Sequence, residues 1–534
     1  MNIHISRRAV ALIVLVSFSF LSDPARGQLD KGHQLLLKYG LQTQGLVRIG
    51  DNFHLSTYQG GNYSTVNFEW TSDASFLASN PNFPWARWVG DQSQMPTAAE
   101  KTAMPNLVML QLGDEQNLND ATVRQNSIDW FNNVRAQYPN TILSVNNWGS
   151  QINATALSDF IVRGKPDLIS FDTYPFQNVY PSTTTPMVPE GGSPTDWYSD
   201  LRKYHTIAKR HGIPFGAYMD TFHAVQDYDA KSFRDPSLSE MNLNAHGALA
   251  FGATVLHDFT YNTGASSLFD RTPEGVAAGD SFPNARYAQK TQINQRAHNL
   301  GKTLVALKPL ADSPLTNGQP SGDGRTTSIV FFSGKHMENG TPVFNALPSD
   351  FHVDTAAAKQ TSPAYANRGA YSDFEVGRND PYLTGGNAFI SGTQNLGTRN
   401  NGLPGDVFIS WFKLLDESLD GDAFTNQVYF MITNGLTDVA GDGFDCRQMI
   451  SLDFSFGASG ITMLQRLNPY SGLVEDVALT PVSNKRRLTW TMDGGTTDLF
   501  KYKTGAPFVV VPEPASLPLL SIAAAWLLTR RKSR

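Results

Sequence analysis

The chain has 534 residues, a formal net charge of −6, and 40% hydrophobic, 11% aromatic and 17% charged residues. This length suits two or three domains with a large core, and the acidic balance argues against a dedicated nucleic-acid-binding protein. The single cysteine, Cys446, excludes an intrachain disulfide and any cysteine-rich metal site.

The N-terminal residues have the features of a secretory signal peptide. Arg7 and Arg8 precede the apolar run 9–21, and the small residues Ala25 and Gly27 offer a cleavage site near Gln28. The alternative interpretation is an uncleaved membrane anchor. The apolar run is shorter than the roughly 20 residues that cross a bilayer as a helix, so the signal peptide is favoured. We therefore expect export, with residues 1–27 removed.

Residues 28–300 alternate short apolar runs with amphipathic stretches. Strands are predicted at 65–70, 85–89, 107–112, 141–146, 167–171, 214–219 and 252–258, and helices at 122–137, 196–211, 238–250 and 288–307. Alternating strands and helices are typical of an α/β fold with a parallel sheet and right-handed crossovers. Seven strands over about 230 residues favour a (β/α)8 TIM barrel, with the eighth strand within 46–56. A doubly wound sheet is the alternative, but no G-x-G-x-x-G follows an early strand.

Acidic, amide and aromatic residues follow five of the predicted strands. These residues include Asp114, Glu115, Asn147, Trp148, Asp172, Tyr174, Asp220, His223, His257 and Asp258. Active sites of (β/α)8 barrels lie at the C-terminal ends of the strands, so we expect these side chains to surround one site. Acidic residues also cap helices in such loops, so a structural role is the alternative for any one of them.

This combination of residues suits the cleavage of glycosidic bonds. The reaction needs two carboxyl groups, one to protonate the leaving oxygen and one to stabilise or attack the anomeric carbon. Aromatic rings offer flat apolar faces for sugar rings. The predicted catalytic residues are Glu115, Asp220 and Asp172, and the predicted substrate-binding residues are Trp148, Asn147, Tyr174, Tyr218, His223, Asp114 and Asp258. No H-E-x-x-H or clustered His and Cys spacing occurs, so we expect neither a metal nor a cofactor.

Three phrases resemble strand ends of clan-A-like glycoside hydrolases, which are TIM-barrel enzymes that often carry a trailing β-sandwich. They are LGDEQN at 112–117, ISFDTYP at 169–175 and ALAFGATVLHDFTY at 248–261, which look like the fourth, sixth and eighth strand ends of that family. The resemblance covers roughly residues 65–261 and implies that Glu115 is the general acid/base. We expect aromatic faces to bury Glu115 and to keep it protonated.

The chain departs from the family's pattern at two positions. The family usually has Asn before the acid/base glutamate, where this chain has Asp114. The family's nucleophile is usually a glutamate that ends strand seven, and the nearest group here is Asp220, whose side chain is shorter. Asp172 is the other candidate for the second carboxylate, and a barrel without catalytic activity is the alternative.

Residues 301–510 have a different pattern, with short alternating or β-branched runs between Gly, Asn and Asp turns. Strands are predicted at 328–333, 406–414, 427–432, 449–456, 460–464, 487–492 and 498–502. This pattern is typical of an antiparallel β-sandwich. Acidic turns at 416–422 and 438–445 lack the EF-hand spacing, so exposed turns are favoured over calcium sites.

The last segment, 511–534, combines Pro-Glu-Pro at 512–514, a short apolar stretch and a basic cluster at 529–534. This order resembles the PEP-CTERM sorting signal of Gram-negative bacteria. The resemblance implies an exosortase-type processing enzyme as a partner, transient membrane association through this segment, and a final place at the cell surface or outside the cell.

The sequence therefore predicts an exported enzyme that hydrolyses O-glycosidic bonds of a polysaccharide or oligosaccharide. A non-catalytic glycan-binding or surface matrix protein with a pseudoenzyme barrel is the alternative, because the strand-seven glutamate is absent. A structural surface protein whose sandwich mediates adhesion is a third interpretation. The sequence names neither the sugar nor the linkage.

Overall fold

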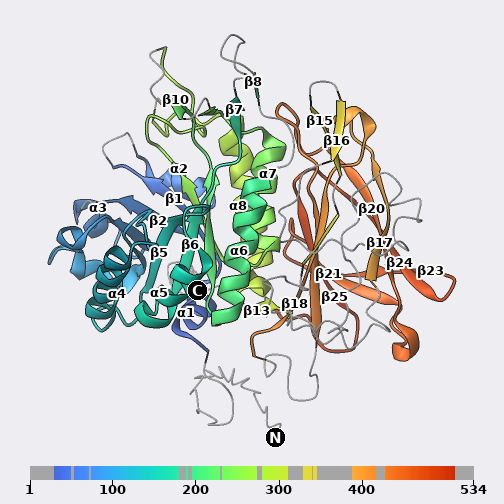
Figure 1. Cartoon of the computed structure of the whole chain (residues 1–534), viewed down its shortest axis with the longest axis horizontal. Helices are drawn as coiled ribbons and strands as arrows, with labels where there is room; N and C mark the ends of the chain where they lie inside the picture. Colours follow the sequence, from blue (N-terminus) through green and yellow to red (C-terminus); the bar gives the residue numbers. More distant parts are fainter. Residues whose placement is uncertain are drawn as a thin grey trace, which may run out of the picture.

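The structure is a computed structural model that describes residues 29–511, except 50–52, 71–73, 180–187, 190–194, 229–230, 274–278, 311–328, 333, 339–340, 345–387 and 417–426. Eight parallel strands close into a barrel, and antiparallel sheets follow it in the chain. The barrel, in blue to green, and the sheets, in orange to red, lie side by side with helices between them (Figure 1). The predicted (β/α)8 barrel followed by an antiparallel β-sandwich is confirmed.

The barrel strands occur around the ring in chain order. They are β1 (Gln42–Val47), β2 (Thr65–Glu69), β3 (Trp85–Val89), β4 (Leu107–Leu112), β5 (Ile142–Trp148), β6 (Leu168–Asp172), β9 (Phe215–Asp220) and β12 (Val255–Phe259). β12 pairs with β1 and closes the ring, with Gln44 beside His257. All seven strands predicted for this part of the chain overlap observed barrel strands.

The prediction that the remaining strand lies within 46–56 is wrong, because β1 begins at Gln42 and overlaps that range only at its start. The sequence of β1, QTQGLV, is partly polar, yet all its residues are buried. The Gln42 amide donates to the backbone oxygens of Tyr39 (3.1 Å) and Gly40 (3.0 Å), and its oxygen accepts from Thr65 Oγ1 (2.7 Å). These hydrogen bonds replace those to water, so the buried strand needs no apolar run.

Helices cover the outside of the barrel. They are α1 (Lys31–Tyr39), α2 (Leu55–Gly60), α3 (Ala74–Ser79), α4 (Ala121–Arg135), α5 (Ala154–Gly164), α6 (Thr195–His211), α7 (Leu238–Ala250) and α8 (Ala285–Leu304), with the 3-10 helix η2 (Glu100–Asn106) before β4. At the start of α4, the Asp120 carboxylate accepts hydrogen bonds from the backbone N–H groups of Thr122 (2.8 Å) and Val123 (3.0 Å). The predicted helices are present as α4, α6, α7 and α8, and α1, α2, α3 and α5 were not predicted.

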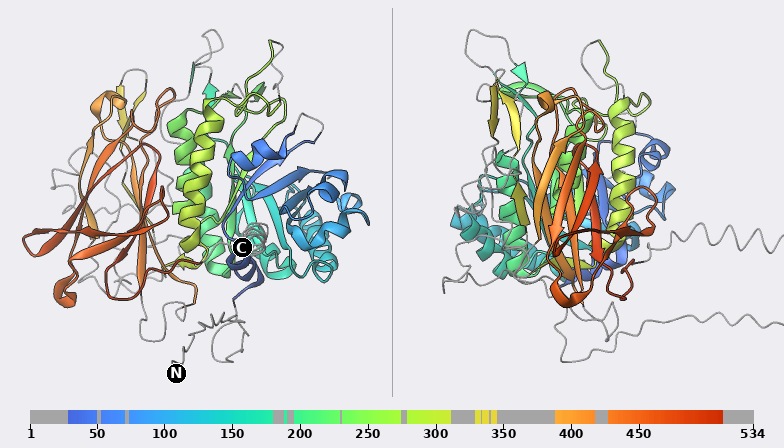
Figure 2. Two further views of the ribbon diagram at one scale, coloured as in Figure 1. Left: turned by 180° about the vertical axis from the view of Figure 1, so that it is seen from behind. Right: turned by 90° about the vertical axis from the view of Figure 1, so that its right-hand side faces the viewer.

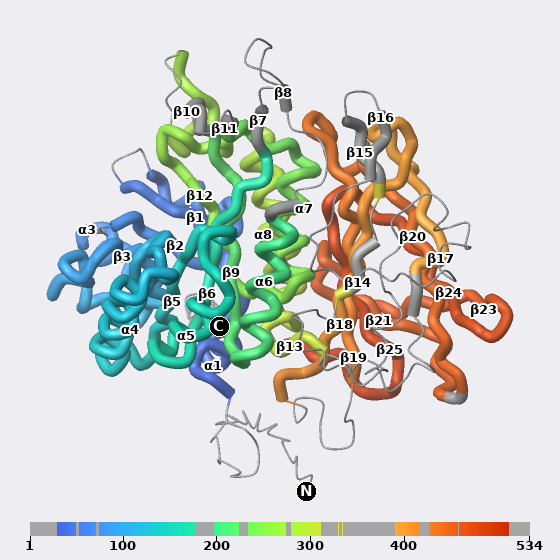
Figure 3. The backbone as a smooth tube through the Cα atoms, in the orientation of Figure 1, coloured from blue at the N-terminus to red at the C-terminus, as the bar shows by residue number. Residues whose placement is uncertain are grey.

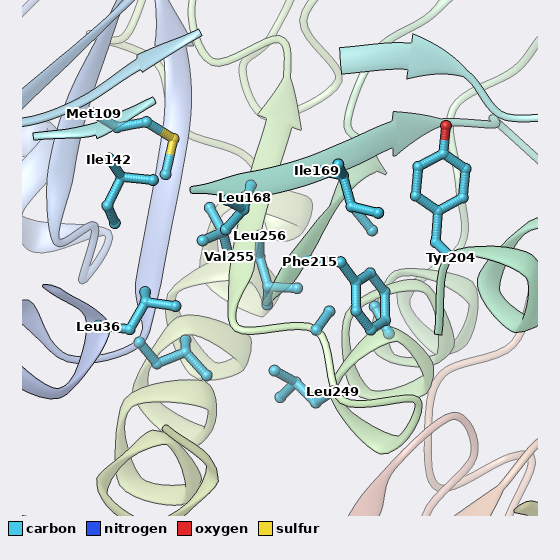
Figure 4. Packing of buried hydrophobic residues seen from close by; sticks show 14 of the residues in the cluster. Leu36, Met109, Ile142, Leu168, Ile169, Tyr204, Phe215, Leu249, Val255 and Leu256 are labelled. Carbon is cyan, nitrogen blue, oxygen red and sulfur yellow. The ribbon is translucent and has the colours of Figure 1, made fainter. Parts of the chain in front are cut away.

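The barrel core is apolar near the starts of its strands. Leu168, Phe215 and Val255 from three neighbouring strands lie in one buried cluster with Leu249 of α7 and Leu36 of α1 (Figure 4). Polar residues of the same strands lie further along them, toward their C-terminal ends. The barrel is therefore closed by apolar packing at one end and lined by polar groups at the other.

The segments that follow β6 and β9 pair with each other in a small antiparallel sheet. Its strands are β7 (Gln177–Val179), β8 (Val188–Pro189), β10 (Ala224–Tyr228) and β11 (Lys231–Phe233), in the order β10-β11-β7-β8. Because these segments leave the C-terminal ends of their barrel strands, the small sheet lies over that end of the barrel, at the top in Figure 1.

The C-terminal part of the chain forms two antiparallel sheets that share a core. The larger contains β13 (Leu307–Pro309), β14 (Ile329–Phe332), β18 (Val407–Leu414), β19 (Val428–Asn434), β21 (Met463–Leu467), β22 (Val474–Ala478) and β25 (Thr497–Tyr502), and the smaller contains β17 (Ala388–Asn395), β20 (Gln448–Phe454), β23 (Thr480–Val482) and β24 (Lys485–Met492). β15 (Lys335–Glu338) and β16 (Thr341–Phe344) form a separate hairpin. Trp411 and Phe430 of the larger sheet pack in one core with Ile450 and Leu488 of the smaller. All seven strands predicted for this part overlap observed strands.

The larger sheet packs against the barrel as well as against the smaller sheet. Along β18, Ile409 and Trp411 belong to the sandwich core, whereas Phe408 and Phe412 belong to the barrel core. α7 lies between the barrel and this sheet (Figures 2 and 3), and all its residues after Leu238 are buried. The barrel and the sandwich therefore share one continuous apolar contact.

The predicted signal peptide and the predicted sorting segment, apart from Val511, lie outside the described residues. Of the helices in the described ranges, none has both the length and the apolar composition needed to span a bilayer. α8 ends at Leu304 and β13 begins at Leu307, so the chain passes there from the helices around the barrel to the antiparallel sheets.

Candidate active site

A tight turn after β4 separates two adjacent carboxyl side chains. Gly113 and Glu115 both have positive φ, at 77° and 45°. Glu115 is not glycine, so this left-handed conformation costs roughly 1–2 kcal/mol. The backbone N–H of Glu115 donates to the carbonyl of Asn146 on β5 at 3.1 Å, which holds the turn against the next strand. Glu115 is exposed and Asp114 is partly buried, so the expectation that Glu115 is buried by aromatic faces is wrong.

Asp114 points into a polar environment inside the barrel mouth. Its Oδ1 accepts hydrogen bonds from Gln111 Nε2 (3.1 Å) and Asn146 Nδ2 (2.9 Å). Burial and, to a smaller degree, the charge of Glu115 raise the pKa of Asp114 to about 7, against the opposing effect of these two hydrogen bonds. Asp114 therefore changes its charge near neutral pH.

Asp172 ends β6 and is buried. Burial is the main cause that raises its pKa well above the usual range, followed by the charge of Glu115, hydrogen bonding to Glu115 and the charge of Asp114. We call Asp114, Glu115 and Asp172 the carboxyl cluster. Three carboxylates this close repel one another, which favours the protonated form of Asp172.

Asp220 ends β9 and lies apart from the carboxyl cluster in its interactions. Its Oδ2 accepts a hydrogen bond from the backbone N–H of Phe176 at 3.4 Å, and its own N–H donates to Asn244 Oδ1 at 2.7 Å. Burial raises the pKa of Asp220, and the charge of Arg234 opposes that rise. Asp220 is thus anchored by groups from α7 and the segments after β6 and β9.

Three of the predicted aromatic residues lie at the same end of the barrel. Tyr218 donates to Gln111 Oε1 at 2.6 Å, and its ring stacks on His257 with centroids 4.7 Å apart. Burial raises the pKa of Tyr174, and the next causes are the charges of Asp172, Tyr218, Asp114 and Asp220, so Tyr174 lies among these groups. Trp148 is 50% exposed and stands beside Asp172 in the register of β5 and β6.

Three other predicted binding residues have different surroundings. Asp258 forms an ion pair with Lys290 of α8 at 2.6 Å and accepts from Tyr63 Oη at 2.5 Å, so it is bonded in the barrel wall and is not brought into the cluster. Burial and the charge of Arg271 lower the pKa of His223, whose backbone N–H donates to Ala265. Asn147 is buried, and neither atom of its amide has a hydrogen-bond partner among the described residues.

The structure also brings to the barrel mouth three polar residues that were not predicted, Gln44, Asn67 and Trp88, together with His257, which was expected there. Gln44 Oε1, Asn67 Oδ1, Trp88 Nε1 and both ring nitrogens of His257 are buried without a hydrogen-bond partner among the described residues. Leaving such groups unpaired costs roughly 1–3 kcal/mol each, so water or a bound polar molecule is needed to satisfy them. A polar residue between apolar neighbours, such as Asn67 in TVNFE or Gln111 in LVMLQL, was the signal available in the sequence.

Within the described ranges, no three His, Cys, Asp or Glu side chains are arranged as a metal site requires. The acidic turn at 438–445 is described, and there Asp438 and Asp445 face Arg399 at 3.7 Å and 3.6 Å. Most of the other acidic turn, 416–422, lies outside the described residues.

No protein-family model matches the chain, and no curated protein matches it. Among solved structures, the chain is similar to a GH128 endo-β-1,3-glucanase from Amycolatopsis mediterranei in complex with laminaritriose, with 12% identity over 48% of this chain and 100% of that one and a TM-score of 0.32. It is also similar to a β-galactosidase from Bacillus circulans sp. alkalophilus (9% identity, 87% and 99% covered, TM-score 0.39) and to the aldolase QR15 (8% identity, 42% and 90% covered, TM-score 0.26). These similarities are distant and include different activities, so they assign none to this chain.

Proposed function

We propose that this chain is a carbohydrate-active hydrolase that cleaves O-glycosidic bonds, with Asp172 and Glu115 as the reacting carboxyl groups. The observation that carries the proposal is the carboxyl cluster, in which buried Asp172 lies against Glu115 at the C-terminal end of the barrel. Acid-assisted cleavage of a glycosidic bond requires one protonated and one ionised carboxyl group at one site. Tyr174, Tyr218 and Trp148 lie at the same end and offer aromatic faces to a sugar.

The surroundings of the two groups give them different roles. Asp172 is buried among other carboxyl groups and keeps its proton, so it donates that proton to the leaving oxygen. Glu115 is exposed, so it acts as the carboxylate that attacks the anomeric carbon or activates water. These roles are the reverse of the acid/base role that the resemblance implies for Glu115.

The distance between the carboxyl groups must change when substrate binds. Catalytic pairs lie about 5–5.5 Å apart in retaining enzymes and about 6.5–9.5 Å apart in inverting ones. Asp172 and Glu115 are close enough here for hydrogen bonding, which is nearer than either arrangement. A sugar that enters between them moves Glu115 outward, since Glu115 stands on an exposed turn.

Export from a Gram-negative bacterium is part of this proposal. The basic and apolar N-terminal segment and the Pro-Glu-Pro tail support it. The substrate is then a polysaccharide or oligosaccharide outside the cytoplasm, and the tail provides transient membrane association until an exosortase-type enzyme removes it. Mass spectrometry of the mature protein from its host should show both ends missing, and intact termini would contradict export and sorting.

The first prediction concerns the two reacting groups. Asp172→Asn and Glu115→Gln each remove a proton-transfer or nucleophilic group while keeping the side-chain shape. We expect each variant to lower the turnover of a responsive glycoside by roughly 10²–10⁴-fold, measured on a panel of aryl glycosides and polysaccharides. Asp129→Asn on α4, whose carboxylate accepts from Gln125 at the surface, is the matched control and should keep full activity. Unchanged turnover in both variants would contradict the assignment of Asp172 and Glu115 as the reacting groups.

A non-catalytic glycan-binding protein is the second candidate function. The observation in its favour is Asp220, the only acidic residue of β9, which is bonded to Phe176 and influenced by Arg234 instead of the carboxyl cluster. Binding of the wild-type chain to a glycan array, together with the absence of any turnover on the same sugars, would favour this candidate. Turnover by the wild type that is lost in Asp172→Asn would exclude it.

A further inference from the structure

A cavity lies where α8 meets the sandwich. It has a volume of about 230 Å³, and its lining includes Arg296, Arg447, Arg466, Tyr470, Asp493 and Asp498. None of its lining residues belongs to the carboxyl cluster. The volume is below the roughly 300–1,000 Å³ of sites for drug-sized molecules, so the cavity suits a small ligand.

Two of the three arginines in this cavity have acidic partners. Arg447 forms an ion pair with Asp493 at 2.9 Å, and Arg466 forms one with Asp498 at 2.8 Å. The second oxygen of Asp498 accepts from Trp490 Nε1 at 2.6 Å. The hydrogen bonds of both carboxylates described here therefore go to groups other than Arg296.

Arg296 is the exception among the three. It is only 8% exposed, and its Nε and Nη1 have no hydrogen-bond partner among the described residues. Its guanidinium lies 4.3 Å from the centre of the Tyr470 ring, which interacts with the cation but accepts no conventional hydrogen bond. The charge of Arg296 also acts on Asp498, where it opposes the rise in the pKa of that carboxyl group. Its buried Nε and Nη1 donors still have no acceptor among the described residues, and a small anion would supply one.

Hydrogen bonds hold the turn that carries Tyr470 against α8, which carries Arg296. Asn299, one turn along α8, donates from Nδ2 to the carbonyls of Pro469 (2.9 Å) and Tyr470 (3.2 Å). Asn468 Oδ1 accepts from the backbone N–H of Tyr470 at 2.9 Å. The turn that carries Tyr470 is thus fixed against the helix that carries Arg296, and the guanidinium is oriented before any ligand binds.

We propose that this cavity binds a small oxyanion through Arg296. An oxygen of a carboxylate or phosphate can accept a hydrogen bond from either of these donors, and such charge-assisted hydrogen bonds are roughly twice as strong as neutral ones. The carboxylate of an acidic sugar and free inorganic phosphate share this chemistry. The ligand would contact the barrel through α8 and the sandwich through the lining of the cavity, and its binding does not depend on the proposed function.

The test uses isothermal titration calorimetry and thermal melting of the full chain with sodium phosphate, glucuronate and, as the neutral comparison, glucose. We expect at least one of the two anions to bind and to raise the melting temperature, and glucose to do neither at this site. Binding of glucuronate alone identifies an acidic sugar as the ligand, and binding of both identifies a general oxyanion site. If neither anion binds to the wild-type protein or raises its melting temperature, the proposal is overturned, and no variant is needed to show it.

Variants locate the binding. Arg296→Gln should weaken anion binding by about tenfold or more, whereas Arg163→Gln, an exposed arginine on α5, should leave it unchanged. Arg296→Lys keeps the charge with a different set of donors and serves if the glutamine variant does not fold, and it too should bind more weakly. Affinity equal to wild type in either folded Arg296 variant overturns the proposal. Glu115→Gln should bind the anion normally, which separates this site from the carboxyl cluster.

Discussion

The ionisation of Asp114 makes the free energy of unfolding depend on pH. Its carboxylate accepts two hydrogen bonds, yet burial and the charge of Glu115 raise its pKa to about 7. An aspartate in an unfolded chain has a pKa of about 3.9. Between about pH 4 and pH 7 the folded state therefore binds more protons than the unfolded state, and the free energy of unfolding falls as the pH rises through that window.

Asp114→Asn should remove this dependence, because the amide oxygen still accepts from Gln111 and Asn146 but carries no charge. We expect the variant to match wild type near pH 4 and to exceed its free energy of unfolding near pH 8 by at most about 4 kcal/mol. Urea denaturation at the two pH values measures the difference. A variant that loses stability with rising pH as steeply as wild type would contradict the role of Asp114.

His257 gives the opposite dependence. It is buried, and burial lowers its pKa to about 3, whereas a histidine in an unfolded chain has a pKa of about 6.5. The unfolded state therefore binds the extra proton as the pH falls from about 6.5 to 3, so the contribution of His257 lowers stability on the acid side.

His257→Phe keeps a ring that can stack on Tyr218 and cannot be protonated. We expect the loss of stability between about pH 6.5 and pH 3 to be smaller in this variant than in wild type, by at most about 4–5 kcal/mol. A variant that loses stability as steeply as wild type over this range would contradict the role of His257. Chemical denaturation across this pH range decides between the two outcomes.

At the scale of elements, α7 has the most demanding position. It is buried on all sides between the barrel and the larger sheet, so its ends must satisfy their own backbone groups. Ser237 and Glu240 form a capping box at its start. Ser237 Oγ also donates to the carbonyl of Asp438 in the sandwich at 2.6 Å, and the Glu240 carboxylate pairs with Arg234. One cap therefore fixes the helix and connects it to the other half of the molecule.

Ser237→Ala should lower the free energy of unfolding by about 1–3 kcal/mol, because it removes the cap and the bond to Asp438 together. Ser158→Ala is a matched control, since Ser158 lies within α5 and its hydroxyl has no partner among the described residues. The control should be neutral or slightly stabilising, as alanine favours helix. Equal effects of the two substitutions in thermal melts would show that the cap does not matter.

At the scale of the whole molecule, the barrel and the sandwich stabilise each other. β18 places Phe408 and Phe412 in the barrel core and Ile409 and Trp411 in the sandwich core. Neither half can unfold without exposing apolar residues of the other. We therefore expect the described part of the chain to unfold in one cooperative transition.

Phe412→Ala tests this coupling, because Phe412 is 2% exposed and contacts the barrel from a strand of the sandwich. We expect a loss of about 3–5 kcal/mol that shifts the whole transition. Phe282→Ala, at a side chain that is 57% exposed, should change stability little. Differential scanning calorimetry with two separate peaks in the wild type, or with only one of two peaks shifted in the variant, would contradict the coupling.

The sequence by itself determined the class of fold and most of its elements. Apolar runs such as LVMLQL and β-branched runs such as VYFMITN match β4 and β19, because a buried strand must present apolar side chains to its neighbours. β1 was placed wrongly, since Gln42 is buried through hydrogen bonds that no periodicity records. Short helices such as α2 and α3 were missed for a similar reason, because one or two turns leave little pattern.

The carboxyl residues could be named from the sequence, but their relation could not. Three acidic residues follow predicted strands, namely Glu115, Asp172 and Asp220. Their positions in the sequence do not show which of them act together in one site. The left-handed turn exposes Glu115, burial and neighbouring charges raise the pKa of Asp172, and hydrogen bonds hold Asp220 apart. Those outcomes depend on distances between residues far apart in the chain. Tertiary structure alone decided them, because burial and neighbouring charge, and not residue type, set the state of a carboxyl group.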